Sequence, residues 1–472
     1  MKGSEIMSEN MQPLEKVNDQ LASLEGSSSG DAKTLKAGSI SLSSLIVLAI
    51  SAAAPAMCIS GSIGYIMGGS GLAVPLAFLI ATIVVVLISV SYAQLSERYN
   101  SAGGTYSYVR EVLGGKAGWW TGWQYIGMTF MAGCGGSIFA IYLNSMFPQV
   151  PLWLGVLIIV IATSLVGWFG IQLSTKAVIA LWVVQMILFI VPAIITLRSQ
   201  ALVMPEFSGQ IARAWTPGLG IKGLFMGVLF CIWSYVGFEV PAYMGEEVKG
   251  GSKSIKKAIP IGAIAIGITY IIASWLWVTS ISQANLAAVT NSGTALIDLL
   301  GILSSPTSQM LVIAAVAIAC VACWFSFITA MLRMFYDMGR SKALPKAFAT
   351  LNKHSSPKFA CYVISVLWFL MALFGAYISV DVLVALFASF ACVAYICVSI
   401  SNMKDRWHSK GVKAVFANKI IPVITIAILL IMICSQSKLY IGLLAGWGVI
   451  GLIIIQVISA VKGKDYFKKM KI

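Results

Sequence analysis

One carboxylate stands inside an apolar segment, where a charge is costly. Glu239 lies between Phe238 and Val240 in the stretch WSYVGFEVPAYMGEE, and Pro241 follows two residues later. A charge at the centre of a membrane helix costs at least ~2.5–3.5 kcal/mol on insertion scales, so it persists where it faces a cavity or a partner. The other acidic residues fall nearly all in tails, loops or span ends. We therefore predict that Glu239 lies deep in the membrane and faces such a cavity or partner.

A second apolar segment is interrupted as well, in the stretch ISAAAPAMCISGSIGYIMGGSG. Pro55, followed by Ser60, Gly61, Ser62 and Gly64, disfavours a continuous helix there. The two interruptions fall in the first and the sixth apolar segments, at similar depth. Two discontinuous helices five spans apart are the pattern expected of an inverted five-plus-five repeat with a binding site at the membrane midplane.

Discontinuous helices expose backbone groups of both polarities to a ligand. Unpaired N–H groups on one half-helix attract a carboxylate, and carbonyls on the other attract an ammonium or another cation. Together they fit an amino acid or an amine. In an unbroken helix Trp233 and Glu239 would point about 120° apart, at roughly 100° per residue. Unwinding at SYVGF would let both line one cavity.

The elements that carry these groups follow from composition. Of the 472 residues, 59% are hydrophobic and 10% are charged, a balance that would leave large apolar patches on a soluble protein. The predicted fold class is therefore an all-α polytopic membrane protein, because ~20 apolar residues are needed to cross a bilayer as a helix. Twelve such segments are expected, near residues 42–67, 72–95, 117–146, 152–170, 175–197, 221–245, 257–281, 307–336, 360–378, 380–401, 419–436 and 439–461.

Basic residues are divided unevenly between alternate connections. All of the 32 lysines and arginines except Arg198, Arg213, Lys222 and Lys438 fall on one side of the predicted membrane. The positive-inside rule then predicts a multi-pass protein of the cell (inner) membrane with both termini in the cytoplasm. The net charge of +15 is explained by this topology, so a nucleic-acid partner is not expected.

Four parts of the chain are predicted. Residues 1–40 are polar and Gly/Ser-rich, which is typical of a disordered cytoplasmic tail and lacks the pattern of a removable signal peptide. Residues 41–401 would form a ten-helix inverted-repeat core, and residues 402–461 would add helices eleven and twelve. Residues 462–472 would form a basic cytoplasmic tail.

Cysteines and histidines give no sign of a metal site. The nine cysteines lie almost entirely in apolar segments, and Cys320 and Cys323, at the one metal-like spacing, have no second pair or histidine nearby. We expect small buried side chains with inert thiols. Both histidines, His354 and His408, fall in basic polar loops. No metal and no cofactor is predicted.

Three separated motifs resemble one transporter family. GFEVPAYMGEEVKG resembles the sixth-span signature of the amino acid–polyamine–organocation transporters, and SERYNSAGGTYSYVREVLGG is similar to their loop after span two. ITAMLRMFYDMGRSKALPKAFA resembles the end of their eighth span. The resemblance covers nearly the whole chain. It implies a secondary transporter of an amino acid or amine, of the twelve-helix fold with broken helices one and six.

Within that family the pocket looks most like that of bacterial arginine/agmatine antiporters. Their sixth-span Trp, six residues before a glutamate, matches Trp233 before Glu239, and their eighth-span Trp matches Trp324 ahead of Asp337. By this resemblance Trp233 would be an inner gate, and Glu239 would couple to protons. Aromatic faces suit a cationic group through cation–π attraction. The substrate-binding residues that the resemblance and the breaks imply are Ala56, Met57, Cys58, Ile59, Ser60, Gly61, Tyr125, Trp233, Ser234, Gly237 and Trp324.

The sequence departs from the family pattern at two places. Its first-span run reads APAMCISGSIGY where the family has a Gly-x-Gly-Ile-Phe-like loop. Proton-coupled symporters of the family often carry a lysine in span five, where Gln185 stands here and Lys176 lies too near the cytoplasmic end. Glu239 then becomes the leading proton carrier, or the protein is a simple exchanger. The small, apolar third span MTFMAGCGGSIF would suit a hydrophobic or aromatic side chain as well as arginine.

Other classes of membrane protein fit less well. A six-plus-six transporter of another small solute would place its repeat at spans one and seven, but AIPIGAIAIGITYIIASWLW has no matching polar break. A membrane enzyme would need paired acids or a histidine near the membrane face, and a channel would need a filter or charged pore motif. The expected partners are therefore a small amino acid or amine, protons and the lipid bilayer. The chain is expected to be a monomer or a homodimer.

Overall fold

The protein is described here from a computed structural model. The structure describes residues 40–169, 175–203, 207–290, 292, 294–303, 305–463 and 465–470. Residues from Ala37 to Ile472 belong to one compact unit. The predicted tail at residues 1–40 lies outside the described residues except for Ile40.

Regular structure in the described residues consists of helices. In chain order these are α3 (Leu42–Ala53), α4 (Pro55–Ser70), α5 (Val74–Arg98), α6 (Thr105–Leu113), α7 (Gly115–Met131), α8 (Cys134–Met146), α9 (Leu152–Phe169), α10 (Thr175–Val203), α11 (Phe207–Arg213), α12 (Gly220–Tyr235), η1 (Val240–Glu247), α13 (Ser252–Thr279), α14 (Gln283–Val289), α15 (Ala295–Leu303), α16 (Pro306–Arg340), η2 (Lys346–Ala349), α17 (Lys358–Tyr377), α18 (Val380–Asp405), α19 (Val412–Val415), η3 (Phe416–Ile420), α20 (Ile421–Cys434), α21 (Lys438–Lys462) and η4 (Phe467–Lys469).

The predicted number of membrane-crossing segments is confirmed. Among the described residues, twelve helical segments are long and apolar enough to cross a membrane, in the predicted order. The eighth, α16, is longer than predicted, because Ser305 caps its start and it continues through polar residues to Arg340. The seventh segment, α13, runs unbroken from Ser252 to Thr279.

The first span consists of two helices, α3 and α4. They are separated by Ala54, which has left-handed backbone angles (φ 42°, ψ 66°), and α4 restarts with Pro55 as its first residue. A proline at this position costs little, because the first N–H groups of a helix have no intrahelical acceptor. Pro55 therefore allows α4 to begin directly after the turn at Ala54.

The sixth span changes its helix type halfway. The α-helical part, α12, ends at Tyr235, and the 3-10 helix η1 starts at Val240. Between them Gly237 has φ +119°, and a Cβ added there would lie 2.6 Å from the Cβ of Ala52. Glycine is required here by its backbone angle and by the close approach of the first span. The interruptions of spans one and six thus lie against each other.

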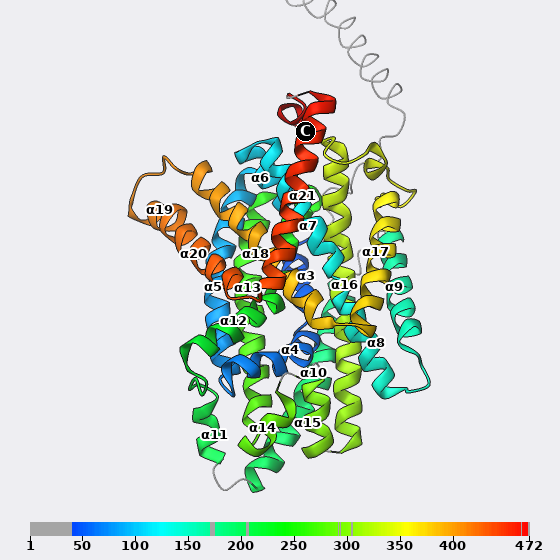
Figure 1. Cartoon of the computed structure of the whole chain (residues 1–472), viewed down its shortest axis with the longest axis vertical. Helices are drawn as coiled ribbons and strands as arrows, with labels where there is room; N and C mark the ends of the chain where they lie inside the picture. Colours follow the sequence, from blue (N-terminus) through cyan, green and yellow to red (C-terminus); the bar gives the residue numbers. More distant parts are fainter. Residues whose placement is uncertain are drawn as a thin grey trace, which may run out of the picture. The chain divides into compact units, whose positions relative to one another are not determined.

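Several helix ends are tied together on the face that includes the C-terminus, which we call the basic face. Lys256 of α13 and Arg406 after α18 both pair with Glu97 of α5. The hydroxyl of Tyr466 donates to the carbonyl of Lys342, just after α16. Figure 1 shows α6 and the C-terminus at this end of the molecule, and α11, α14 and α15 at the other.

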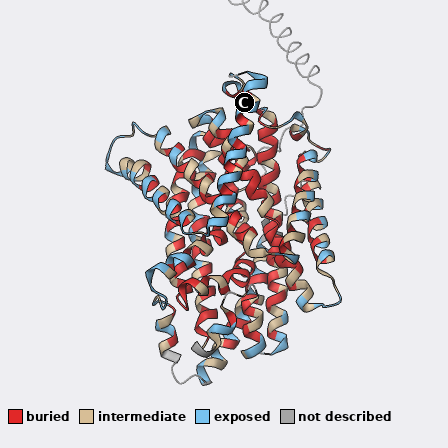
Figure 2. Cartoon of the chain, in the orientation of Figure 1, coloured by how far each residue is buried: buried red, intermediate tan, exposed pale blue. Residues whose placement is uncertain are grey.

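The core lies around α4, α7, α8, α12, α16 and α18. Burial is densest in the span formed by α7 and α8 and lowest in α21, where 78% and 22% of the most apolar window is buried. Figure 2 shows buried residues running through the middle of the bundle and exposed residues along outer helices such as α9 and α20. In the two interrupted spans, 61% and 72% of the most apolar window is buried.

Candidate functional site: a central cavity at two helix interruptions

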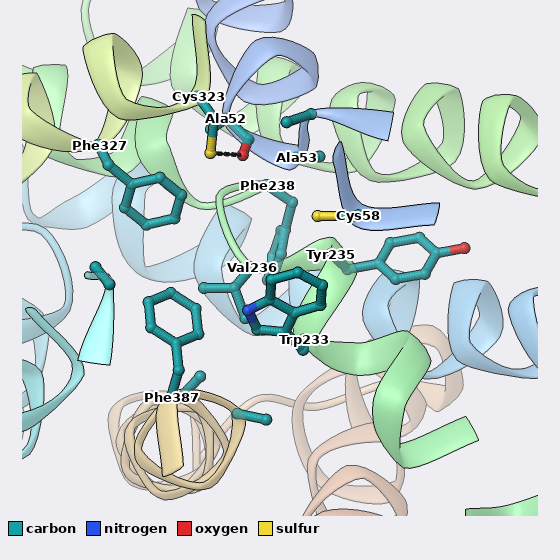
Figure 3. Packing of buried hydrophobic residues seen from close by; sticks show 14 of the residues in the cluster. Ala52, Ala53, Cys58, Trp233, Tyr235, Val236, Phe238, Cys323, Phe327 and Phe387 are labelled. Carbon is teal, nitrogen blue, oxygen red and sulfur yellow. Dashed lines mark hydrogen bonds between the residues drawn. The ribbon is translucent and has the colours of Figure 1, made fainter. Parts of the chain in front are cut away.

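A small cavity lies where the interruptions of spans one and six meet. Its volume is about 20 Å³, room for about one water molecule. Figure 3 shows the rings of Phe327 and Phe387 facing the indole of Trp233 across this region. Its lining comes from six helices, the turn between α7 and α8, and the segment after α12. It consists of Ala52, Met57, Cys58, Ala132, Cys134, Gly135, Trp233, Val236, Cys323, Trp324, Phe327 and Phe387. A solute larger than water can enter this central cavity only if side chains move.

The lining of the central cavity is apolar, aromatic and sulfur-rich, and it includes no charged side chain among the described residues. Trp324 is fixed on one side by its indole N–H, which donates to the carbonyl of Ala132 at 3.2 Å. It also packs against Trp368, with ring centroids 4.5 Å apart. A Cβ on Gly135 or Gly136 would overlap the indole, so these two glycines make room for it. The groups that face the central cavity are therefore mainly aromatic rings and thiols.

Trp233 separates the central cavity from a second one. It lines the central cavity and also a cavity of about 190 Å³ on the side away from the basic face, which we call the outer cavity. The outer cavity is bounded by α12, α18, the turn between α20 and α21, and the start of α21, and its lining includes Phe230, Ala388 and Tyr440. Trp233 itself is 4% exposed. The indole of one residue therefore stands between the two cavities.

The backbone at both interruptions is held by a buried tyrosine on α13. The hydroxyl of Tyr270 donates to the carbonyl of Ala53, at the end of α3, and lies 2.7 Å from the carbonyl of Ser234, near the end of α12. A hydroxyl has one proton, so it can donate to only one of the two at a time. The thiol of Cys323 donates to the neighbouring carbonyl of Ala52 at 2.9 Å, as Figure 3 shows. Carbonyls of spans one and six thus converge beside the cavity.

Glu239 lies next to the central cavity, toward the basic face, and is 1% exposed. Its carboxylate accepts hydrogen bonds from the hydroxyls of Tyr395 (3.0 Å) and Tyr125 (3.2 Å) and from the N–H of Gly237 (2.9 Å). These three donors meet the prediction that a buried acid needs partners. Further hydroxyl groups are hydrogen-bonded to that of Tyr125, directly or through Thr105. Together with Tyr395 they form the tyrosine cluster, which we define as Tyr92, Thr105, Tyr125, Tyr243 and Tyr395.

Beyond the tyrosine cluster, ion pairs connect the loop after span two to spans six and eight. Asp337 of α16 accepts from Ser107 at 2.6 Å and pairs with Arg110 at 3.4 Å and Arg340 at 2.8 Å. Arg340 also pairs with Glu246 of η1. Burial by itself lowers the pKa of Arg110, but the carboxylate of Asp337 and the neighbouring Tyr106 and Glu111 outweigh it, so its pKa is raised.

A second ion pair lies beside these contacts, between Arg333 of α16 and Glu247 of η1, with one N···O distance of 2.9 Å. We call this set the ion-pair layer: Arg110, Glu246, Glu247, Arg333, Asp337 and Arg340. The ion-pair layer joins α6, η1 and α16.

The predicted site residues occupy different positions relative to the central cavity. Met57, Cys58, Trp233 and Trp324 line it. Tyr125 and Gly237 are not part of the described lining; both donate hydrogen bonds to Glu239. Of the remaining predicted residues, Ala56, Ile59, Ser60 and Gly61 lie buried in α4, and Ser234 lies buried in α12.

Among the predicted residues 56–61, only the first turn of α4 can offer free N–H groups. In α4 the N–H of Cys58 already donates to the carbonyl of Ala54. The free N–H groups at a helix start belong to its first turn, which leaves Ala56 and Met57, since Pro55 has none.

Several residues of the site were not identified from the sequence. Phe327 and Phe387 are the largest of the unpredicted lining residues. Tyr270 bonds to spans one and six, and Tyr395 bonds to Glu239. Phenylalanine and tyrosine are common in apolar spans, so their residue type and spacing did not distinguish these four from other aromatic residues. Gln185, which was singled out in span five, is buried, and its amide has no hydrogen-bond partner among the described residues.

Comparisons with known proteins agree on one family. Residues 44–468 match the family model for amino acid permeases. The chain is 27% identical over 337 residues to an arginine/agmatine antiporter of Chlamydia abortus, which covers 67% of this chain and 68% of that protein. It is 24% identical over 422 residues to the low-affinity putrescine importer PlaP of Escherichia coli K12, covering 84% and 88%. It is also 24% identical over 351 residues to the gamma-aminobutyric acid permease of Escherichia coli K12, covering 71% and 74%.

Proposed function

The chain belongs to the amino acid permease family, and from this premise we propose that it moves an amino acid or its amine across the plasma membrane by alternating access. The match confirms the family resemblance carried by the three sequence motifs. The chain is accordingly a multi-pass membrane transporter and not an enzyme. The substrate, the coupling and the residues that perform them belong to the proposal.

The proposed architecture is an inverted five-plus-five repeat in which spans one and six are the discontinuous pair. The closest helix pairs support it, since α5 packs most extensively on α13, α4 on α12, α10 on α16 and α7 on α18. In span numbers these pairs are two with seven, one with six, five with eight and three with ten. Exchanging each span with its counterpart five positions away leaves this set unchanged. The unbroken α13 argues against a six-plus-six arrangement.

The observation that carries the substrate class is the position of the central cavity at both interruptions. The start of α4 would offer the N–H groups of Ala56 and Met57 to a carboxylate, as helix N-termini do. Carbonyls at the ends of α3 and α12, now bonded to Tyr270, would accept an ammonium. Ring faces of Trp233 and Trp324 would hold the side chain. The relatives named for arginine, agmatine, putrescine and gamma-aminobutyric acid support this class.

Glu239 is the proposed proton carrier, and the tyrosine cluster would hold it in place. A carboxylate with hydroxyl and N–H donors can gain and lose a proton without leaving a donor unsatisfied for long, because hydroxyls reorient. Span five carries Gln185 in place of a lysine, and the described lining of the central cavity includes no carboxylate, lysine, arginine or histidine. We propose net uptake linked to protons, with exchange of amino acid against amine as the alternative.

The proposed orientation places the basic face in the cytoplasm, and with it both termini. The positive-inside rule supports this assignment. The ion-pair layer would then close the cytoplasmic side, and Trp233 would separate the central cavity from the outer side. This reverses the inner-gate role that the resemblance alone suggested for Trp233.

Radiolabelled uptake into proteoliposomes tests the proposal. Purified protein would be offered single amino acids and amines, with and without the same compounds inside, and with and without an imposed pH gradient. We expect pH-driven uptake into empty vesicles that is lost in Glu239→Gln. The matched control is Glu97→Gln, which makes the same change in a half-exposed carboxylate of the basic face.

Two other outcomes would change the proposal. Uptake that requires an internal counter-substrate would establish exchange and exclude net proton-linked import. No uptake of any amino acid or amine by folded protein would reject the substrate class.

A further inference from the structure

A long groove runs between the second half of α18 and α20, in a region that the transport site does not use. Its volume is about 730 Å³. We call it the α18–α20 groove, and its lining consists of Ile400, Met403, Lys404, Trp407, His408, Val423, Ile426, Ala427 and Leu430. The walls are aliphatic, and the polar side chains Lys404, Trp407 and His408 gather at one end.

The local fold keeps α20 apart from α18 at this end. A loop and the short helix α19 lead into the π-helical turn η3, after which α20 begins at Ile421. A π-turn inserts an extra residue per turn and shifts the helix that follows it. Figure 1 shows α19 standing away from α18, and α20 approaching it further along. The groove is therefore a product of the fold and opens toward the surrounding membrane.

The polar end of the groove carries positive charge. Lys404 and His408 line it, and the ammonium of Lys419 lies 4.7 Å from the ring centre of Trp407. Asp405, which follows Lys404 in the chain, is already paired with Arg98 at 2.8 Å and accepts a hydrogen bond from Tyr99. Among the described residues, no carboxylate pairs with Lys404.

Lys404 also reaches a second surface of the basic face. It lines a polar depression of about 740 Å³ together with Lys116 and Lys468. The acids of that depression are paired locally, Glu111 with Arg110 at 2.8 Å and Asp465 with Lys468 at 2.9 Å. The region around Lys404 thus stays positive on both sides.

This combination matches the shape and charge of a phospholipid. The groove wall from Val423 to Leu430 is ~10 Å long at 1.5 Å per residue, about two thirds of one leaflet's hydrocarbon thickness of ~15 Å. Tryptophan and lysine at the same end mark the membrane interface. Basic pockets between spans at such an interface attract anionic head groups. A zwitterionic lipid would gain less, because its own cation would face Lys404.

We propose that the α18–α20 groove binds one anionic phospholipid. One acyl chain lies along the aliphatic wall, and the phosphate lies at Lys404, His408 and Lys419. The inference requires only that the chain spans a membrane, so it stands whether or not the proposed substrate and coupling are correct.

Quenching of Trp407 by brominated lipids tests the proposal. The full-length protein would be placed in phosphatidylcholine vesicles that contain, at equal mole fraction, acyl-brominated phosphatidylglycerol or acyl-brominated phosphatidylcholine. The signal of Trp407 is the difference between the unchanged protein and Trp407→Phe. We expect the anionic lipid to quench Trp407 about twofold more than the zwitterionic lipid, from enrichment at the basic end.

Variants separate the head-group contact from the acyl-chain contact. Lys404→Gln should remove the difference between the two lipids, Lys404→Arg should keep it, and Ala427→Phe should lower quenching by both because it fills the groove. The matched control is Lys410→Gln, the same charge change in the same loop but outside the groove lining.

Four results would overturn the proposal. These are equal quenching by the two lipids, an equal effect of Lys410→Gln and Lys404→Gln, full quenching in folded Ala427→Phe, and loss of the lipid preference on adding glycerol phosphate. The last would mean that the basic end takes a soluble phosphate rather than a lipid.

Discussion

The central cavity is closed in different ways toward its two faces. Toward the basic face lie two successive polar layers, the tyrosine cluster around Glu239 and the ion-pair layer centred on Asp337. Toward the opposite face the indole of Trp233 stands between the central and outer cavities. One closure consists of many directed polar contacts, and the other depends on the packing of one ring.

This difference suggests which side opens first. A hydrogen bond to a charged group contributes ~1.5–3 kcal/mol, and the ion-pair layer has several that must be broken together. Moving the Trp233 side chain breaks no ion pair. From the state described here, access from the face opposite the basic face should require the smaller rearrangement. Access from either face can be measured by labelling Cys58, in the cavity lining, in a parent variant that retains it as the only cysteine.

The largest effect is expected from Asp337→Asn. This change removes the buried carboxylate that pairs with Arg110 and Arg340 and, among the described residues, leaves Arg110 paired with Glu111 alone. Breaking a buried pair costs ~3–5 kcal/mol. Labelling of Cys58 by a membrane-impermeant maleimide added at the basic face should rise by ~100-fold or more, at tenfold per ~1.4 kcal/mol. The control is Asp465→Asn, which removes an exposed pair of the same face. An unchanged labelling rate in folded Asp337→Asn would mean that the ion-pair layer does not hold this side closed.

Glu239→Gln should have the next largest effect, on coupling rather than on folding. The amide cannot take up and release a proton, and it offers an N–H toward hydroxyls that now donate. Proton-driven uptake should fall by at least about tenfold, which corresponds to loss of ~1.4 kcal/mol, while exchange of substrate persists. Tyr395→Phe, which removes one donor, should give a smaller loss. Proton-driven uptake at the unchanged rate would assign the proton to another group.

Trp233→Ala should weaken the closure toward the opposite face without affecting the basic face. Removing a buried indole joins the central and outer cavities. We expect labelling of Cys58 from that face to rise by about tenfold, given that large-to-small changes at buried aromatics cost ~3–5 kcal/mol but partly collapse. Phe230→Ala, on the wall of the outer cavity alone, serves as the comparison. An equal increase from both faces would show that Trp233 supports the whole fold rather than one gate.

The smallest effect is expected from Gly136→Ala. The added methyl group would overlap the ring of Trp324, and overpacking of this kind costs ~1–3 kcal/mol. The variant should unfold at a temperature several degrees lower, measured by thermal denaturation in detergent, and should bind substrate more weakly because Trp324 shifts. Gly446→Ala in α21, where a Cβ meets nothing within 4 Å, should change neither.

The sequence predicted the helices and the unusual position of Glu239, but not what surrounds it. Apolar runs and basic loops are sufficient to predict twelve spans. Each span must be apolar and must pair its own backbone N–H and C=O groups within the bilayer. Proline, glycine and one buried acid predicted the interruptions of spans one and six, because each of these residues disfavours a continuous membrane helix by itself. The partners of Glu239 could not be read, since Tyr395 lies 156 residues further along the chain and tyrosines in spans are common.

The cysteines show the limit of reasoning from residue type. They were expected to be small buried side chains, and Cys58, Cys134 and Cys323 are buried and free. Residue type did not predict that these three also line the central cavity. The sequence motifs contain the residues of the ion-pair layer but did not predict which of them pair. Arg110 and Asp337, for example, lie 227 residues apart in the chain. Contacts between distant spans depend on packing, which no single segment encodes.

Protection of Cys58 by a transported substrate tests the central claim most directly. In the variant with Cys58 as its only cysteine, the rate of labelling by a small maleimide would be measured with and without a saturating amino acid or amine that the protein transports. If the site lies at the two helix interruptions, the transported compound slows labelling and a compound that is not transported leaves it unchanged. An unchanged rate with a compound that the same vesicles take up would place the transport site elsewhere in the protein.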